Sequence, residues 1–571
     1  MEKIKKLKKI LIRENLDGYL IPKNDEFFCE YTPSHNDRLN FISNFTGSYG
    51  FSLILRDKNY LFVDGRYTLQ AKAQCGKYFK IITFPNKMPF QILKKKLIIG
   101  FDPKIFTKKT LNVFFSEKLL NLKPLNKNII DEIWKRKIHK NKRQFFSLPR
   151  NAVDESYKSK IDKIISNLRE KGGDYQFISS SENNAWLYNI RGKDTKFTPL
   201  PYSYSLIDKN RKIKFFCDLK KISLSLKKYL NKVAFFEINH TEKILSQIRN
   251  KKFILDGSSC SFYFEKIISE KNFILKHHDP INYLKAIKGK REIRNIEKAH
   301  IYDGVALTKY LFWLKKNFSK KKVTELSASK KLFEFRKKNM KFKFSSFPTI
   351  SGSGPNGAII HYKATEKTNR RLNKGDIYLV DSGGQYEYGT TDVTRTISLQ
   401  NSSKRVKNIF TKVLKGHIAV ADYKLKNKTS GSEIDKSARK YLKRIGLDYS
   451  HGTGHGVGYF LNVHEGPQAL SKNNKIKIQE GMVISNEPGY YEKNNFGIRI
   501  ENLLYVKKKD NRRYFKNLTM APIDKDLINK IELNQNEKKW LNNYHHTVFE
   551  NLKKFMNKFE LLELKKACSA I

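Results

Sequence analysis

The sequence predicts two similar α/β domains followed by an α+β domain. The length of 571 residues exceeds the roughly 250 to 300 residues at which a single hydrophobic core stops growing. One strand-turn-strand pattern occurs twice in the first half of the chain, and the pattern changes after residue 287. We therefore place the domains at residues 1–148, 149–287 and 288–571.

The chain begins with a predicted amphipathic helix at residues 1–15. Ile4, Leu7, Ile10 and Leu11 recur there at helical spacing among lysines, without the continuous apolar core of a signal peptide. No run of about 18 apolar residues, the length needed to span a bilayer, occurs in the sequence. The five cysteines have no paired spacing, which is typical of a reducing compartment. We expect a cytoplasmic protein.

The repeated pattern occupies residues 41–67 and 186–221. Each copy runs from an apolar-Asn-Gly turn through a strand and an Asp-Lys-Asn turn into a second strand, which ends at Asp64 or Asp218. Lysine-rich helices between the strands, such as one expected near 156–170, indicate α/β units. A duplicated domain is the favoured interpretation, and a chance likeness is the alternative.

The third domain begins with a helical pattern at residues 291–317. Strands and glycine-containing turns then dominate residues 347–365, 375–399 and 481–506. Helices followed by antiparallel hairpins indicate an α+β domain. Within it, Gly352, Gly354 and Gly357 match the GxGxxG spacing, but Pro355 interrupts the motif and the next residues, AIIH, are strand-like. A dinucleotide site requires a helix there, so we predict a simple turn.

The net charge of +58 is the footprint expected of a protein that binds nucleic acid or an anionic membrane. The lysines are nevertheless spread along the whole chain and do not gather in one tail or groove. A biased composition is the favoured interpretation, and a functional anionic partner stays open. We do not expect sequence-specific binding of nucleic acid.

Two predicted hairpins carry acidic residues. A turn around Tyr386 and Glu387 would make Asp381 face Asp392, with Cβ atoms about 4.5 to 5.5 Å apart. Two carboxylates so placed repel each other unless a positive charge lies between them. Each acid taken alone is more often a surface or turn residue.

The second hairpin, with its turn at Asn494, makes Glu487 face Glu501. Three histidines lie in the glycine-rich stretch 451–467, where a solvated loop is the alternative to a site. Four carboxylates with one imidazole form a hard, oxygen-dominated set of donors. Such a set is suited to two divalent ions, for example Mn²⁺.

Several motifs closely resemble those of the pita-bread metallopeptidases, in particular the long, three-domain aminopeptidase P (Xaa-Pro aminopeptidase) subgroup. The catalytic-domain motifs are GAIIHYKAT, LVDSGGQYEYGTTDVTRT, HGTGHGVGYFLNVHEGP, NEPGYY and FGIRIENLL. The likeness continues through RLNFISNFTGS, FVDGRYTLQA, INYLKAIKGKREI and WLNNYHHTVFENL. It implies two similar N-terminal α/β domains, a pita-bread catalytic domain and a homodimer.

The resemblance also implies an activity. It is the release of the N-terminal residue from peptides with proline in the second position, through a water that bridges two divalent metals, with Mn²⁺ expected. The implied metal ligands are Asp381, Asp392, His455, Glu487 and Glu501.

By the same resemblance, His361, His464 and Glu487 are catalytic, with Glu487 as the general base and the histidines stabilising and protonating the reacting amide. Arg38 would approach the substrate, and Arg499 would support the ligands. The implied substrate-binding residues are Arg38, His361, His451, His464 and Arg499.

Two other functions remain to be separated from this one. A prolidase uses the same ligands to cleave only Xaa-Pro dipeptides. A non-enzymatic pita-bread protein that binds nucleic acid or ribosomes would fit the charge, but such proteins characteristically lose metal ligands, and this chain has all five. Two domains before the catalytic one, the FLNV spacing between His455 and His464, and the extension past Glu501 favour aminopeptidase P. The many lysines of the first two domains depart from the family pattern.

Overall fold

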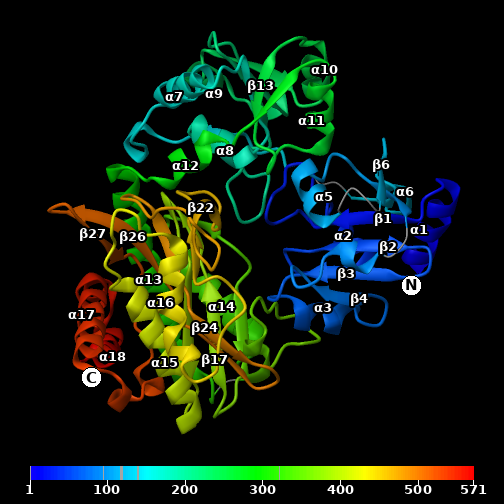
Figure 1. The fold of residues 1–571 in the computed structure, drawn as a ribbon. Coiled ribbons are helices and arrows are strands. Elements are labelled where there is room, and N and C mark those ends of the chain that lie inside the picture. The colour runs from blue at the N-terminus through cyan, green and yellow to red at the C-terminus, as the bar shows by residue number, and fades with distance from the viewer. Residues whose placement is uncertain (1, 94–95, 116–119, 138–140, 321) are drawn as a thin grey trace. The chain divides into compact units, whose positions relative to one another are not determined.

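The computed structural model describes residues 2–93, 96–115, 120–137, 141–320 and 322–571. The chain divides into two compact units. Figure 1 draws the helices and strands, coloured from blue at the N-terminus to red at the C-terminus. The first unit comprises Met1–Arg150 and Glu155–Asn282, and the second comprises Asn151–Asp154 and Tyr283–Ile571. Helix α12, Pro280–Ala286, spans the division between them.

The first unit contains a six-stranded sheet with the strand order β4-β3-β2-β1-β5-β6. The β2–β1 and β2–β3 pairs are antiparallel, and the β3–β4, β1–β5 and β5–β6 pairs are parallel. The strands are β1 Gly18–Pro22, β2 Phe51–Leu55, β3 Asn59–Val63, β4 Lys80–Thr83, β5 Leu97–Phe101 and β6 Leu120–Pro124. Its helices are α1 Glu2–Arg13, α2 Arg38–Ser43, α3 Thr68–Cys75, α4 Pro89–Ile92, α5 Lys108–Phe114 and α6 Ile130–Ile133.

A second sheet in the same unit repeats this arrangement, in the order β12-β11-β10-β8-β13-β14. Each pair has the same direction as its counterpart in the first sheet. The strands are β8 Tyr175–Ile178, β10 Tyr204–Asp208, β11 Ile213–Cys217, β12 Val233–Glu237, β13 Lys252–Leu255 and β14 Phe273–Lys276. The remaining elements are β7 Phe146–Ser147, β9 Ile190–Arg191, α7 Tyr157–Glu170, α8 Ser181–Leu187, α9 Leu224–Tyr229, α10 His240–Gln247 and α11 Phe262–Ser269.

The predicted duplication is therefore confirmed. The repeated pattern corresponds to the hairpins β2–β3 and β10–β11, and Asp64 and Asp218 directly follow their second strands. The predicted amphipathic helix is α1, whose four apolar side chains at the predicted spacing are buried, and the helix expected near 156–170 is α7. Periodicity predicted these elements because each buries a single apolar face.

The first unit also buries an acid, Asp25, whose carboxylate accepts hydrogen bonds from the Phe27 amide at 3.1 Å and the Tyr202 hydroxyl at 3.4 Å. Burial, assisted by the charge of Glu26, raises the pKa of Asp25 from 3.8 to about 6. Because the folded pKa is the higher one, the folded state favours the protonated acid. That contribution to stability is present below pH 3.8 and is lost as the pH rises through 6.

We expect Asp25→Asn to remove this pH dependence. The free energy of unfolding of the variant relative to the wild type should rise by roughly 2.5 kcal/mol between pH 4 and pH 7.5. Urea unfolding at several pH values measures the difference. A difference that stays constant with pH would show that Asp25 is not the source of the pH dependence.

In the described residues of the second unit, six helices of 11 or more residues combine with small antiparallel sheets, as predicted for an α+β domain. The helices are α13 Lys290–Asn317, α14 Glu325–Lys337, α15 Lys404–Ala421, α16 Gly431–Lys443, α17 Gln535–Leu552 and α18 Lys558–Cys568. The strands are β15 Phe342–Ser345, β16 Ile350–Ser353, β17 Ile377–Ser382, β18 Gly384–Tyr386, β19 Gly389–Thr390, β20 Val393–Ser398, β21 Gly454–Gly456, β22 Glu465–Leu470, β23 Val483–Asn486, β24 Gly489–Glu492, β25 Phe496–Arg499, β26 Asn502–Lys509 and β27 Arg512–Asn517.

The C-terminal helices belong to the core of this unit. Leu541, Val548 and Leu552 of α17 and Leu564 of α18 pack in one buried cluster with Val413 and other residues of α15. The red helices α17 and α18 lie beside each other in Figure 1. Among the described residues, none of the helices combines the length and apolar content needed to cross a bilayer.

The register of the first acidic hairpin differs from the prediction. Asp381 pairs with Thr394, not with Asp392, because the turn lies at Glu387 and Tyr388. The offset is two residues, and side chains along a strand alternate between faces, so the predicted face of the sheet is retained. The prediction that Asp381 directly faces Asp392 is wrong.

The second hairpin has the predicted register. Asn486 pairs with Asn502 and Gly489 pairs with Arg499, which makes Glu487 and Glu501 opposite each other between the two ladders. The predicted turn at the glycine motif is a 3-10 helix, Gly354–Ala358, with φ +54° at Gly354. The strand expected at AIIH is absent, because the 3-10 helix and a turn occupy these described residues.

Candidate active site and metal centre

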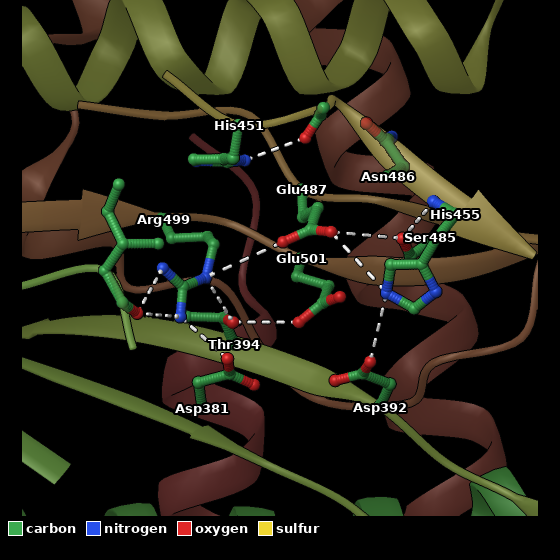
Figure 2. Close-up of polar contacts among 12 residues, drawn as sticks. Asp381, Asp392, Thr394, His451, His455, Ser485, Asn486, Glu487, Arg499 and Glu501 are labelled. Carbon is green, nitrogen blue, oxygen red and sulfur yellow. Dashed lines mark hydrogen bonds and ion pairs between the residues drawn. The ribbon is translucent and has the colours of Figure 1, made fainter. Parts of the chain in front are cut away.

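Five residues implied as ligands gather where the strands of the second unit end (Figure 2). Asp381 lies on β17, Asp392 directly precedes β20, and His455 lies on β21. Glu487 directly follows β23, and Glu501 lies between β25 and β26. Asp381, Asp392 and Glu501 are at most 8% exposed, so the site is enclosed by protein.

Three of these residues already have metal-binding geometry. Single donor atoms of Asp392, His455 and Glu501 all lie within 4.8 Å of one another. His455 Nε2 lies 3.5 Å from an oxygen of Asp392 and 3.6 Å from an oxygen of Glu487. The ring thus lies between these two carboxylates, as Figure 2 shows.

The orientation of His455 fixes which nitrogen faces the carboxylates. Its Nδ1 lies 2.9 Å from the Gly456 carbonyl oxygen, which can only accept, so Nδ1 carries the proton. Nε2 is then the nitrogen with a free lone pair in the neutral ring. Metal-binding histidines characteristically have such a partner on the second nitrogen.

The carboxylates of this group repel one another. Burial and the charges of Asp381 and Glu487 raise the pKa of Asp392 well above its ordinary value. Burial and the charges of Asp392 and Glu487 do the same for the pKa of Glu501. A group of buried acids that disfavours its own ionised state binds a cation well, because the cation removes the repulsion.

Arg499 supplies the positive charge on one side of the group. Its Nη2 donates to Asp381 at 2.7 Å, and its Nε donates to the Thr394 hydroxyl at 3.0 Å. Thr394 in turn donates to Glu501 at 2.8 Å. One guanidinium cannot offset four carboxylates, and Asp381 Oδ1 is buried without a hydrogen-bond partner among the described residues. The donor set therefore fits divalent cations.

The predicted histidines differ in their distance from this group. The rings of His464 and His455 are in contact, with centroids 4.1 Å apart. His451 lies further out and is connected through Tyr491: its Nε2 is 2.9 Å from the Tyr491 hydroxyl, which accepts from Arg499 at 2.6 Å. His361 is half-buried and follows Ile360, whose carbonyl oxygen lies 3.5 Å from the Arg499 guanidinium.

Arg38 belongs to the first unit, so its approach to a substrate stays a prediction. It begins α2, is 2% exposed, and donates two hydrogen bonds to Asp131 at 2.9 and 3.0 Å. Glu26 accepts a third at 3.0 Å. Most of its hydrogen-bonding capacity is thus used inside the unit.

Three further residues of the site were not predicted from the sequence. Thr394 and Tyr491 connect the carboxylates to Arg499, and the Ser485 hydroxyl accepts from the His455 amide at 2.9 Å. Thr394 had a detectable signal, because it lies two positions after Asp392 on one strand face. Tyr491 and Ser485 had none, since their partners come from distant segments.

Comparison with protein families gives a match along almost the whole chain. Residues 3–129 and 136–292 each match the creatinase/prolidase N-terminal domain. Residues 294–508 match metallopeptidase family M24, and residues 513–571 match the C-terminal region of that peptidase.

Individual relatives agree with this result. A probable Xaa-Pro aminopeptidase P from Laccaria bicolor is 35% identical, over 96% of this chain and 90% of its own length. The crystal structure of an X-prolyl aminopeptidase from Caenorhabditis elegans, described as a cytosolic enzyme with a di-nuclear active site, is 30% identical with a TM-score of 0.94, covering 100% of this chain and 99% of its own. A prolidase from Pyrococcus horikoshii is 25% identical with a TM-score of 0.52, covering 64% of this chain and 99% of its own. The chain belongs to metallopeptidase family M24, and within it to the Xaa-Pro aminopeptidase P group.

Proposed function

We propose that this protein is a metal-dependent aminopeptidase that releases the N-terminal residue from peptides whose second residue is proline. The observation that carries the proposal is the group of four carboxylates and one imidazole, three of whose carboxylates are buried, in a chain that matches Xaa-Pro aminopeptidases over almost its full length. Xaa-Pro peptides are the proposed substrates.

We infer that the chain holds two divalent cations, with Mn²⁺ as the proposed metal. The proposed ligands are Asp381, Asp392, His455, Glu487 and Glu501. Bound cations supply Lewis acidity, which polarises a scissile carbonyl and lowers the pKa of an attacking water. The mostly carboxylate donor set supports a hard or borderline ion such as Mn²⁺.

Glu487 is the proposed general base. Its side chain is 18% exposed, against 6% for Asp392 and 11% for Asp381, so of these it has the best access to an incoming water. Its backbone amide donates to the Thr453 carbonyl at 2.8 Å, and this contact fixes the backbone from which the side chain extends. A carboxylate so placed can take the proton of the attacking water and pass it on.

His464 and His361 are the proposed groups for the reacting amide. A proline nitrogen has no N–H and leaves as a secondary amine, which needs a proton from the enzyme. The contact of His464 with the His455 ring supports a proton-donating role for His464. His451, Arg38 and Arg499 are proposed to complete the substrate site.

We further propose three domains at 1–148, 149–287 and 288–571, a homodimer, and a cytoplasmic location. The two similar sheets of the first unit support the first division. The cytosolic relative from Caenorhabditis elegans supports the location.

Prolidase is the closest alternative, and a small peptide panel separates it from the proposed function. With Mn²⁺ present, we expect cleavage of the first bond in Arg-Pro-Pro and at least about 100-fold slower cleavage of Arg-Ala-Pro. The length of the cleaved peptide separates the two enzymes. An aminopeptidase needs an open path beyond the proline, whereas a dipeptidase benefits from a cation that captures the proline carboxylate. Mass spectrometry of the products measures both rates.

The dipeptide Arg-Pro is the control in the same panel. Cleavage of Arg-Pro alone would assign the protein to the prolidases. Equal cleavage of Arg-Pro-Pro and Arg-Ala-Pro would remove the proline requirement, and no cleavage of any peptide at saturating metal would overturn the proposed function.

A further inference from the structure

A buried carboxylate outside the metal group organises the segment that carries His361. Glu325, the first residue of α14, is 0% exposed. Its Oε1 accepts from the Ser353 amide at 2.8 Å and from the Asn356 side chain at 3.0 Å. Its Oε2 accepts from the Tyr362 hydroxyl at 2.8 Å and from the Arg370 amide at 3.0 Å.

These four partners all belong to residues 353–370, a segment with little regular structure of its own. The two ends of the segment donate to Glu325 through the backbone amides of Ser353 and Arg370. Its middle donates to Glu325 through the side chains of Asn356 and Tyr362. One side chain therefore takes the place that a β-ladder would have in fixing this backbone.

The glycine motif explains how the segment fits. A Cβ on Gly352 would lie 2.9 Å from the Gly357 nitrogen, so the motif closes backbone against backbone. On the other side, a Cβ on Gly497 of β25 would lie 1.8 Å from the Gly357 oxygen. The glycines thus allow the segment to lie between α14 and the strand that ends at Arg499.

The connection to the active site runs through two neighbouring residues. Ile360 places its carbonyl oxygen 3.5 Å from the Arg499 guanidinium, and Tyr362 is 5% exposed with its ring hydroxyl on Glu325. His361 lies between them in sequence. Its backbone is therefore held from both sides, by β25 and by Glu325.

We propose that Glu325 is a positioning residue that orients His361 toward the substrate through the segment 353–370. The inference rests on the proposed function for its kinetic test only. It gives the glycine motif a role as the close-packed support of a catalytic histidine, where a nucleotide site is excluded by the 3-10 helix that follows.

Glu325→Gln tests the proposal because the two side chains have nearly the same size. Each carboxylate oxygen accepts from a backbone N–H, at Ser353 or at Arg370, so either orientation of the glutamine points its NH₂ group at a backbone donor. The variant therefore loses one of the two backbone contacts and gains a donor facing a donor, without creating a cavity.

The first readout is hydrogen exchange, which requires no activity. The Tyr362 amide donates to the Ile359 carbonyl at 3.0 Å and does not contact Glu325. In Glu325→Gln we expect its exchange to accelerate at least about 10-fold, as local opening becomes easier. Unchanged exchange at Tyr362 in a folded variant would overturn the inference whatever the enzyme cleaves.

The second readout is a double-mutant cycle with His361→Ala. We expect Glu325→Gln alone to lower kcat by about 10- to 100-fold with little change in KM, since a misplacement of about 1 Å can cost that much. In the His361→Ala background the same change should cost less than about twofold. Equal losses in both backgrounds would mean that Glu325 does not act through His361.

Two further variants complete the design. Glu537→Gln changes another buried carboxylate in the first turn of a helix of this unit, one bonded to Lys415 and the Asn534 amide, and should leave kcat and the exchange of Tyr362 unchanged. If Glu325→Gln does not fold, Tyr362→Phe serves as the second test. It removes one contact of Glu325 and should reproduce a smaller part of both effects. A wild type that cleaves no Xaa-Pro peptide would overturn the proposed function, whereas an active wild type with an unaffected Tyr362→Phe would overturn this inference alone.

Discussion

Asp392→Asn is expected to lower kcat/KM by at least about 10³-fold, or roughly 4 kcal/mol of transition-state stabilisation. Asp392 is central to the proposed metal ligands. Its carboxylate lies 3.5 Å from His455 Nε2, and it is one of the three residues whose donor atoms lie within 4.8 Å of one another. An asparagine offers one neutral oxygen and cannot supply two anionic ones. We therefore also expect less than two equivalents of bound metal per chain by elemental analysis.

The fold should survive this change. In the metal-free state Asp392→Asn removes one of the buried charges that repel one another, so the variant should melt above the metal-free wild type at pH 8. Asp524→Asn is the matched control, because the Asp524 side chain in this unit is only 7% exposed but pairs with Lys315 at 2.7 Å. Near-normal turnover in Asp392→Asn would contradict the assignment of the metal site.

The two acidic hairpins show which strand pairings could be predicted from the sequence. The Asn494 turn predicted the pairing of Glu487 with Glu501, because asparagine tolerates the positive φ of 61° that this turn needs. The turn at Glu387 and Tyr388 has no such signal, and its prediction was wrong. The acids still gather, since an error of two residues keeps a strand face.

Contacts between distant segments could not be predicted. Arg395 is 2% exposed and donates to the carbonyl oxygens of Glu501 and Ala521 at 2.7 Å and to the Tyr544 hydroxyl at 2.8 Å. It thereby ties helix α17 to the short connection between β25 and β26 that carries Glu501. Nothing local distinguishes this arginine from a surface one, because its partners lie more than 100 residues away.

The net charge of +58 has no explanation in the fold. Many of the lysines lie exposed along helices and turns of both units, as the sequence pattern of scattered lysines predicted. Scattered exposed charges are consistent with a biased composition, and a partner that binds them stays a hypothesis.

Removing the metals should destabilise the catalytic unit, and more strongly at higher pH. The pKa values of Asp392 and Glu501 are raised in the metal-free fold, chiefly by burial and then by neighbouring carboxylates. Acids whose pKa is raised in the folded state stabilise the fold below their unfolded pKa of about 4. They lose that contribution as the pH rises through their folded pKa values. A cation that replaces the protons restores the stability at neutral pH.

We therefore expect the difference in melting temperature between the metal-loaded and the EDTA-treated protein to grow from pH 5.5 to pH 8. At a free metal concentration about 1,000 times Kd the stabilisation is about 4 kcal/mol. Calorimetric titration in buffers of different ionisation enthalpy should also show protons released on binding, with the number falling toward pH 8 as fewer acids remain protonated. Asp25→Asn is the control, since Asp25 belongs to the first unit and its change should leave the metal-dependent difference intact. A difference in melting temperature that does not vary with pH, together with no proton release, would show that the buried carboxylates are not the groups that bind the cations.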